Sequence, residues 1–300
     1  MRLSHVTRIA AATAAAALVL TATACGNQAE LGGSGAPAPT VAEDTEFEAG
    51  TTMAELNEAG TLRVGTKFDQ PLFGLKGLDG NPVGFDVEIA KLIAAKLGIP
   101  ADKITYTETP SRIREDVIVN DQVDIVVATY TINDARKEKI TFAGPYYQAG
   151  QDIMVAADNT TITGPETLKP TGARVCSVTG STPAKKLEEY VDPANIVLFD
   201  VYSKCADALR NGQVEAVSTD NVILLGLIEA SQGAFKLVDK PFTEEPYGIG
   251  ITKGDVQFCE FINTTLQEAS TSGAYKAAWD ATAGKVQPEA PTLPTADACS

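Results

Sequence analysis

Histidine is nearly missing from this sequence, which contains a single one, His5, among 300 residues. His5 lies in an N-terminal segment that we interpret below as a cleaved signal, so the mature chain would contain none. Histidine-based triads, Cys–His nucleophile pairs and histidine metal sites all require an imidazole. These classes of site are therefore excluded, and the sequence predicts neither a metal centre nor a cofactor.

Basic residues are also scarce, with 24 Lys and Arg against 39 Asp and Glu and a net charge of −15. Removing residues 1–24 takes away Arg2 and Arg8, which leaves 22 basic against 39 acidic residues and a net charge of −17. Such an acidic chain disfavours nucleic acid as a partner. It also repels anions at long range, so an anion site must be built locally from Lys or Arg.

Long hydrophobic runs are missing too. The alanine-rich stretch Ile9–Leu20 is too short for a stable membrane span, and the arginines before it are typical of an export signal. Residues 1–24 end in small residues and resemble a lipoprotein signal that is cleaved before Cys25, whose thiol then carries diacylglycerol. Residues 25–50 offer almost nothing to pack and are predicted to form a flexible tether. We therefore expect a protein outside the cytoplasm, anchored to the outer face of the cell membrane.

Four cysteines remain besides Cys25, and they can form disulfides in three ways. Outside the cytosol they are more often bridged than free, although each could instead be a small buried hydrophobic residue. Cys176 lies in the strand pattern ARVCSV, and Cys205 opens the helical stretch KCADALRNG in the same half of the chain. We favour a Cys176–Cys205 pair, which leaves Cys259 to hold the C-terminal tail through Cys299.

Strand and helix patterns alternate along roughly 235 residues that are expected to fold. This alternation and this length predict two α/β lobes rather than one. The predicted strands are TLRVGT, KITYTE, DIVVAT, ARVCSV, NIVLFD, VEAVST and YGIGIT.

The most informative segment runs from Asp124 to Tyr147, where the strand DIVVA leads into the helical pattern NDARKEK. Thr129 and Thr131 lie at the strand end, and Arg136 lies in the first turns of the helix. Hydroxyl groups, free amides and a guanidinium group at such a junction can bind a small carboxylate. The alternative is that Thr131 only caps the helix, with Asp134 completing a capping box and Arg136 in solvent.

The stretch TYTINDARKEKITFAGPYY resembles bacterial extracellular solute-binding proteins for polar amino acids. In that family two hydroxyl residues, and an arginine five positions after the second, hold the α-carboxylate of the ligand. Thr129, Thr131 and Arg136 fall on those positions. The segment GFDVEIAKLIAAKL, residues 84–97, resembles the signature helix of the same family, and we assign it packing rather than ligand contacts. The resemblance extends from about Thr61 to Gly284.

The resemblance implies a two-lobe, periplasmic-binding-protein-like fold, a Venus flytrap whose lobes are joined by two hinge crossovers. The first crossing follows TFAGPYY, and the return precedes PYGIGI. Lobe 1 is then predicted at residues 51–147 plus 245–284, and lobe 2 at residues 148–244. Residues 285–300 form a Pro-rich tail. We expect a monomer that delivers its ligand to the permease of an ABC importer and catalyses no reaction.

Three further ligand contacts are carried over from the resemblance to lobe 2. Asp220, at the end of a strand, would accept hydrogen bonds from the α-ammonium group of the ligand, unless it is an ordinary helix cap. Thr182, in TGSTPAKKL, would offer its hydroxyl group, or cap a helix. Tyr202 falls where some acidic amino-acid binders use a tyrosine hydroxyl, although a core tyrosine is an equally simple interpretation.

The side-chain pocket determines which amino acid is bound. Lys67, in the loop after the first strand, and Arg112, in PSRIRED, fall on positions that line the cleft in the family, although either could be a surface charge. Phe73 matches a position that covers the ligand, or it packs in the core. Two cations indicate an acidic side chain, so we expect glutamate or aspartate.

Other functions stay open at this point. Within the class, the alternatives are a glutamine, asparagine or aspartate receptor, or a nutrient sensor. An alternative of another class is an enzyme resembling cyclohexadienyl dehydratases, which share this fold and place a carboxylic acid in the cleft. The tether and the complete amino-acid site favour a receptor over an enzyme.

Overall fold

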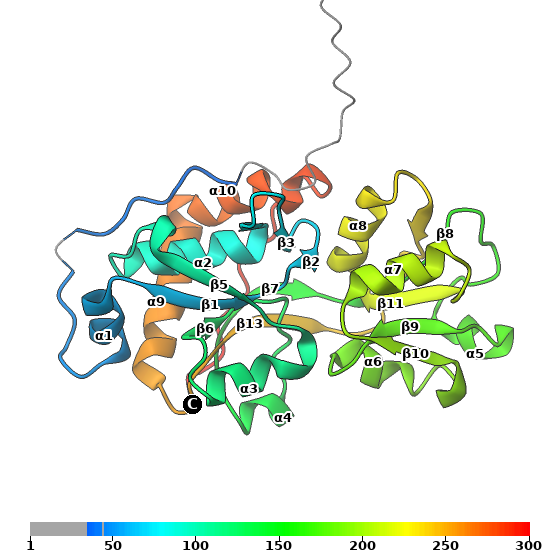
Figure 1. Cartoon of the computed structure of the whole chain (residues 1–300), viewed down its shortest axis with the longest axis horizontal. Coiled ribbons are helices and arrows are strands. Elements are labelled where there is room, and N and C mark those ends of the chain that lie inside the picture. The colour runs from blue at the N-terminus through cyan, green and yellow to red at the C-terminus, as the bar shows by residue number, and fades with distance from the viewer. Residues whose placement is uncertain (1–34, 44) are drawn as a thin grey trace, which may run out of the picture. The chain divides into compact units, whose positions relative to one another are not determined.

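Helices and strands alternate along the chain from Thr52 onward in a computed structural model, which describes residues 35–43 and 45–300 (Figure 1). The α-helices are α1 (Thr52–Ala59), α2 (Phe85–Lys96), α3 (Arg114–Val119), α4 (Asp134–Lys137), α5 (Leu168–Thr171), α6 (Thr182–Leu187), α7 (Tyr202–Arg210), α8 (Asn221–Ala230), α9 (Val256–Ser272) and α10 (Ala274–Ala281). Short 3-10 helices are η1 (Ala101–Lys103), η2 (Ser111–Ile113), η3 (Pro165–Thr167), η4 (Pro193–Asn195) and η5 (Ala283–Lys285).

The strands form two five-stranded sheets and one small three-stranded sheet within the described residues. The first sheet has the order β5 (Ile104–Glu108), β1 (Leu62–Thr66), β6 (Ile125–Val126), β13 (Glu245–Ile251) and β7 (Thr141–Ala149). The second has the order β10 (Ile196–Phe199), β9 (Val175–Val178), β11 (Ala216–Asp220), β8 (Gln151–Ala156) and β12 (Phe235–Leu237). The third is formed by β2 (Asp69–Gln70), β3 (Gly74–Lys76) and β4 (Pro82–Val83).

Both large sheets are built in the same way. Three parallel strands lie at one side, β5, β1 and β6 in the first sheet and β10, β9 and β11 in the second. Two antiparallel strands complete each sheet. Helix α2 packs against α9 and α10 over the first sheet, and α7 and α8 pack against the second. This architecture confirms the predicted two-lobe fold class.

All seven predicted strands are present, and the segment between the two sheets is more regular than expected. Strands β7 and β8 occupy TFAGPYYQAGQDIMVA, which the sequence did not identify as strands. Strand β7 pairs with β13 from Thr141 and Ile251 to Ala149 and Glu245, so the two crossing segments lie side by side (Figure 1). We retain the predicted lobe boundaries as a working division of the chain.

The predicted signal, Cys25 and the first part of the predicted tether lie outside the described residues. The described part of that tether lies along lobe 1. The backbone amide of Ala42 donates to the carbonyl group of Ala95 over 2.9 Å, and Phe47 packs edge-on against Phe261. Within residues 35–43 and 45–300, no helix is long and apolar enough to span a membrane.

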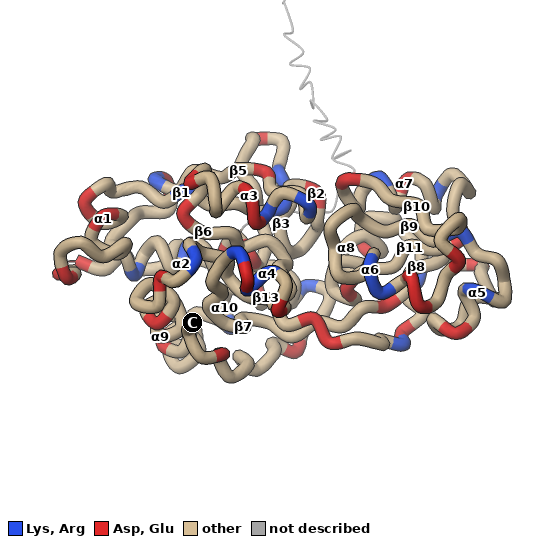
Figure 2. The backbone as a smooth tube through the Cα atoms, turned by 90° about the horizontal axis from the view of Figure 1, so that it is seen from below, with Lys and Arg blue, Asp and Glu red and all other residues tan. Residues whose placement is uncertain are grey.

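Charge is distributed as the composition suggests. Figure 2 shows Asp and Glu positions along both lobes, whereas α4 and α6 each carry Lys or Arg. Most described ion pairs join exposed groups, such as Arg174 with Glu215, and contribute little to stability.

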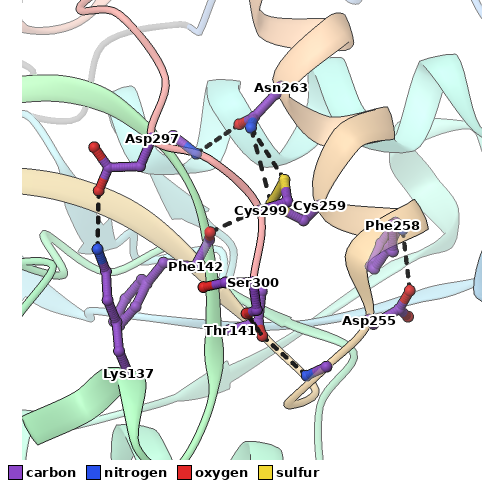
Figure 3. Close-up of a disulfide and its surroundings, with 12 residues drawn as sticks. Lys137, Thr141, Phe142, Asp255, Phe258, Cys259, Asn263, Asp297, Cys299 and Ser300 are labelled. Carbon is purple, nitrogen blue, oxygen red and sulfur yellow. Dashed lines mark hydrogen bonds and ion pairs between the residues drawn. A yellow bond between two sulfur atoms is a disulfide. The ribbon is translucent and has the colours of Figure 1, made fainter. Parts of the chain in front are cut away.

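Both favoured disulfides are present. Cys176–Cys205 joins β9 to α7 within lobe 2, and Cys259–Cys299 joins α9 to the C-terminal tail. Figure 3 shows this second disulfide where the tail passes β7, and the amide of Asp297 donates to the carbonyl group of Gly144 over 2.7 Å. The Pro-rich tail is therefore fixed to lobe 1 through its last residues.

Candidate functional site

A small cavity of about 10 Å³ is lined by side chains from both lobes. Lobe 1 contributes the strand end after β6 and the start of α3, and lobe 2 contributes the ends of β9 and β11 with the helices that follow them. The lining residues are Ser111, Arg114, Thr129, Thr131, Ser181, Thr182, Pro183, Tyr202, Thr219, Asp220 and Ile223. Five of the nine residues predicted to bind a ligand are among them: Thr129, Thr131, Thr182, Tyr202 and Asp220.

Thr129 is held in an unusual backbone conformation by a buried carboxylate. Its φ of 45° lies in the left-handed region, which a β-branched residue rarely adopts. Its amide donates to Oδ2 of Asp86 over 2.8 Å, and the hydroxyl group of Tyr146 donates to Oδ1 over 2.6 Å. Burial raises the pKa of Asp86 to about 7. Helix α2, to which the sequence assigned packing only, thus also positions a predicted ligand residue.

Arg136 contacts protein groups with every guanidinium nitrogen. Nη1 donates to the carbonyl group of Thr131 over 2.6 Å, Nη2 to that of Gly180 over 3.1 Å, and Nε lies 3.2 Å from Glu115. Its pKa falls to about 10, mainly because it is buried. Arg136 lines a hollow next to the cavity rather than the cavity itself. It bridges the two lobes through Gly180.

The helix-cap alternative for Thr131 is wrong. The cap of α4 is Asn133, whose Oδ1 accepts from the amide of Arg136 over 3.0 Å. Thr131 instead forms an isolated bridge with Tyr247 of β13, and the hydroxyl group of Thr182 lies 3.3 Å from its own.

The structure does not bring Arg112 to the cavity. The side chain of Arg112 is exposed and lines the neighbouring hollow, whereas Arg114, two positions on, is 3% exposed and lines the cavity. Nη1 of Arg114 donates to the carbonyl groups of Ala128 and Thr129 over 2.9 and 3.1 Å. Its guanidinium group also lies 4.2 Å from the centre of the Tyr130 ring. Both arginines of PSRIRED were visible in the sequence, but nothing local indicated which would face inward.

Lys67 is buried, as a ligand residue would be, and lies beside the cavity. Its Nζ donates to Oγ of Ser111 over 2.9 Å, and Ser111 lines the cavity. Burial, and then the charge of Arg114, lower the pKa of Lys67 to about 7. Neither Lys67 nor Arg114 forms an ion pair with any residue in the described part of the chain.

Asp220 is the buried carboxylate on the side of lobe 2. It occupies the N-cap position of α8 but makes no capping hydrogen bond with its side chain. The hydroxyl group of Tyr247 donates to its Oδ2 over 2.6 Å, while Oδ1 has no hydrogen-bond partner among the described residues. Burial, and then the charge of Glu245, raise the pKa of Asp220 to about 7.

The last three predicted residues have different surroundings. Thr182 is not the N-cap of α6, because Ser181 occupies that position. The hydroxyl group of Thr182 instead donates to Glu245 over 2.7 Å. The hydroxyl group of Tyr202 is buried at the cavity without a described partner. Phe73 is fully buried and packs edge-on against aromatic core residues, among them Phe85. Phe73 does not line the cavity.

The chemistry of the site follows from these groups. Arg114 and the carboxylate Asp220 line a small space together with the hydroxyl-bearing residues Thr131 and Tyr202. The buried Lys67 lies beside it, next to Ser111. Such a site is suited to a small molecule that carries both signs of charge. The fold and this cavity between two lobes define a two-lobe binding protein.

Comparison with known proteins identifies the family. The model of bacterial extracellular solute-binding proteins, family 3, matches residues 62–281, and the chain belongs to this family. The glutamate-binding protein GluB of Corynebacterium efficiens is 38% identical over 280 residues, which cover 90% of this chain and 88% of that protein. The glutamine-binding protein GlnH of a Bacillus subtilis ABC transporter is 35% identical over 225 residues, which cover 75% of this chain and 81% of that protein.

Solved structures of amino-acid-binding proteins have the same fold as this chain. An ancestral arginine-binding protein bound to glutamine superposes with a TM-score of 0.70 at 35% identity and covers 77% of this chain and 99% of that one. The solute receptor for L-cysteine of Neisseria gonorrhoeae superposes with a TM-score of 0.73 at 26% identity and covers 83% of this chain and 100% of that one.

These comparisons confirm the resemblance, the fold class and the prediction that the protein is not an enzyme. The extracellular character of the family agrees with the expected location outside the cytoplasm.

Proposed function

We propose that this protein is an extracytoplasmic receptor for an acidic amino acid, with glutamate as the first candidate. One observation carries the proposal: Lys67 and Arg114 are buried beside the cavity without a carboxylate partner in the described residues, while Asp220 lies on its other side. An acidic amino acid supplies a side-chain carboxylate for these two cations and an ammonium group for Asp220. The similarity to a glutamate-binding protein supports this assignment.

In this proposal, the two carboxylates bind to different cations. Arg136 binds the α-carboxylate with the hydroxyl groups of Thr129 and Thr131, as the family resemblance implies. It exchanges its contacts with the carbonyl groups of Thr131 and Gly180 for this ligand group. Lys67 and Arg114 bind the distal carboxylate, so Arg114 takes the role that the sequence assigned to Arg112.

The remaining contacts come from lobe 2. The free Oδ1 of Asp220 accepts from the α-ammonium group of the ligand. Tyr202 offers its unpaired hydroxyl group, and Thr182 joins the site through its contact with Thr131.

Charge also decides between glutamate and a neutral amide. Glutamine has nearly the same shape, but it would leave Lys67 and Arg114 buried without a counter-charge. Leaving a buried charge unpaired costs roughly 3 kcal/mol or more. The site therefore favours glutamate, although glutamine-binding relatives share the fold.

Transport follows from closure of the lobes on the ligand. The ligand touches both lobes only when they are closed, so its differential contacts drive closure. We propose that a diacylglycerol on Cys25 anchors the receptor to the cell membrane, and that the closed form delivers its ligand to an ABC importer. Neither step requires chemistry at the cavity.

Titration calorimetry of the full chain in detergent tests the ligand. Glutamate, aspartate, glutamine, asparagine and arginine should be titrated under the same conditions. We expect glutamate to bind at least tenfold more tightly than glutamine, a difference of about 1.4 kcal/mol. Tighter binding of glutamine or arginine would refute an acidic ligand.

A further inference from the structure

Helix α7 begins without a cap of its own. Its N-cap residue is Val201, whose aliphatic side chain makes no hydrogen bond to the first turn. The first amides of a helix have no partner within the helix, and Ser, Thr, Asp or Asn at the N-cap position commonly accept from them. The amides of Tyr202 and Ser203 therefore need an acceptor from elsewhere.

Asp69 is that acceptor, and it comes from the other lobe. Its Oδ2 accepts from the amide of Tyr202 over 2.8 Å and from the amide of Ser203 over 3.3 Å. Asp69 lies in β2 of lobe 1, whereas α7 belongs to lobe 2. Its negative charge also lies at the positive end of the helix, which strengthens the contact. The cap can exist only when the two lobes are together.

The same loop touches lobe 2 a second time. Gly226, inside α8, faces the backbone of Pro71. A Cβ atom at Gly226 would lie 2.4 Å from the carbonyl oxygen of Pro71, so a larger residue forces the lobes apart or displaces the loop. The segment 69–71 is thus seated on two helices of lobe 2.

This loop is connected to the cavity from both sides. Tyr202, whose amide Asp69 binds, lines the cavity. Gln70, the neighbour of Asp69, accepts from the hydroxyl group of Thr129 over 3.0 Å. Contact between the lobes at Asp69 therefore orders residues that surround the ligand.

We propose that Asp69 is a positioning residue that caps α7 across the cleft and so ties ligand retention to closure of the lobes. Opening exposes the amides of Tyr202 and Ser203 to water, and closure returns them to Asp69. The contact stabilises the closed form without touching the ligand. This inference rests on the proposed function only in that closure retains the ligand.

Stopped-flow and calorimetric measurements on Asp69 variants test the proposal, with glutamate as the first probe and glutamine as the second. Asp69→Ala should raise the dissociation rate about tenfold and change the association rate little. Asp69→Asn should restore most of the affinity, because asparagine caps helices as well as aspartate does. An Asp69→Ala variant that releases the ligand at the wild-type rate would overturn the proposal.

Val201→Thr separates this role from simple stabilisation of α7. Threonine at the N-cap position gives the helix its own acceptor within lobe 2, so the double variant Asp69→Ala/Val201→Thr should recover thermal stability. It should not recover ligand retention. Full recovery of the dissociation rate would mean that Asp69 matters only for the stability of the helix, which overturns the proposal.

Gly226→Ala is an independent test of the same contact. Alanine favours a helix more than glycine does, so α8 itself should not be weakened. We expect weaker binding together with less ligand-induced compaction in small-angle X-ray scattering. Wild-type affinity and compaction would contradict the close approach of the lobes. If the wild type does not bind glutamate, the proposed ligand is refuted. The role of Asp69 is then tested with glutamine, so the two proposals fail separately.

Discussion

The hydroxyl group of Tyr247 donates a 2.6 Å hydrogen bond to Oδ2 of Asp220, so a hinge strand holds a carboxylate that belongs to lobe 2. This bond favours the ionised carboxylate, whereas burial disfavours it and raises the pKa of Asp220 to about 7. Tyr247 therefore favours the ionised form of Asp220 that can bind an ammonium group, and it leaves the second carboxylate oxygen, Oδ1, without a partner among the described residues.

The affinity for glutamate should pass through a maximum near pH 7. Asp220 must be ionised to bind the ammonium group, so affinity rises as pH increases through its pKa of about 7. Lys67 must be protonated to bind a carboxylate, so affinity falls as pH increases above its pKa of about 7. Each limb has a slope of up to tenfold per pH unit.

Calorimetry between about pH 5.5 and 8.5 measures both limbs. Lys67→Met should remove the falling limb, and Tyr247→Phe should shift the rising limb to higher pH because Asp220 loses its hydrogen-bond donor. The ratio of variant to wild type cancels the titration of the ligand itself. A profile that is flat in the wild type would contradict these roles.

Arg136→Ala should nearly abolish binding of every amino acid, because the α-carboxylate is common to all of them. The expected loss is roughly 3 kcal/mol or more, since the guanidinium group is buried and also joins Thr131 to Gly180. Lys139→Ala is the matched control, as Lys139 is an exposed cation in the same region. Titration calorimetry gives both affinities. Binding by Arg136→Ala within a few-fold of wild type would exclude this arginine from the site.

The double variant Lys67→Met/Arg114→Gln should shift selectivity toward glutamine. It removes both cations proposed for the distal carboxylate and leaves Thr131, Arg136 and Asp220 in place. A tenfold change in preference requires only about 1.4 kcal/mol, which is within the range of one charge-assisted hydrogen bond.

Lys67→Met/Arg112→Gln is the matched control for that experiment, because it removes the arginine that the sequence predicted and the structure leaves exposed. Parallel titrations with glutamate and glutamine give the ratios. We expect the larger shift with Arg114. Equal ratios in the two double variants would show that Arg114 contributes nothing beyond Arg112.

Cys25→Ser should release the protein into the medium or leave it unprocessed. Cys25 lies outside the described residues, and within them no helix could hold the chain in a bilayer in place of the lipid. Cell fractionation followed by blotting measures the distribution. Retention of the fully processed variant in the membrane fraction would exclude the lipid anchor.

The fold was largely predictable because its strands are short, branched and apolar. The strands around Val64 and Val217 are buried, and buried parallel strands are recognisable from a short run of apolar residues alone. Strand β7 was not recognised, because glycine and proline are uncommon inside strands and occur here at Gly144 and Pro145. Its pairing with β13 also depends on residues about a hundred positions away. Pairing over such distances has no local signature.

The lining of the cavity was predictable where a residue type is tied to a fixed position in a motif. Thr131 and Asp220 reach the cavity from strand ends, as their positions indicated. Arg112 does not reach the cavity, because it is exposed in the turn η2 whereas Arg114, at the start of α3, is buried. The sequence contains no signal for the rotation of so short a helix. Asp86 was not identified as a positioning residue because its partner, the amide of Thr129, is a backbone group without a side-chain signature.

The Cys259–Cys299 disulfide has a consequence for how the chain is threaded. It fixes the C-terminal end to lobe 1, and the described residues that precede α1 also lie along lobe 1. Among the described residues, lobe 2 is therefore an insertion between two parts of lobe 1. Residues 151–237 form a cassette that leaves and returns through β7 and β13. Exchanging this cassette alone should replace the lobe 2 contacts and leave Lys67 and Arg114 in lobe 1, and a reporter fused to the C-terminus stays with lobe 1.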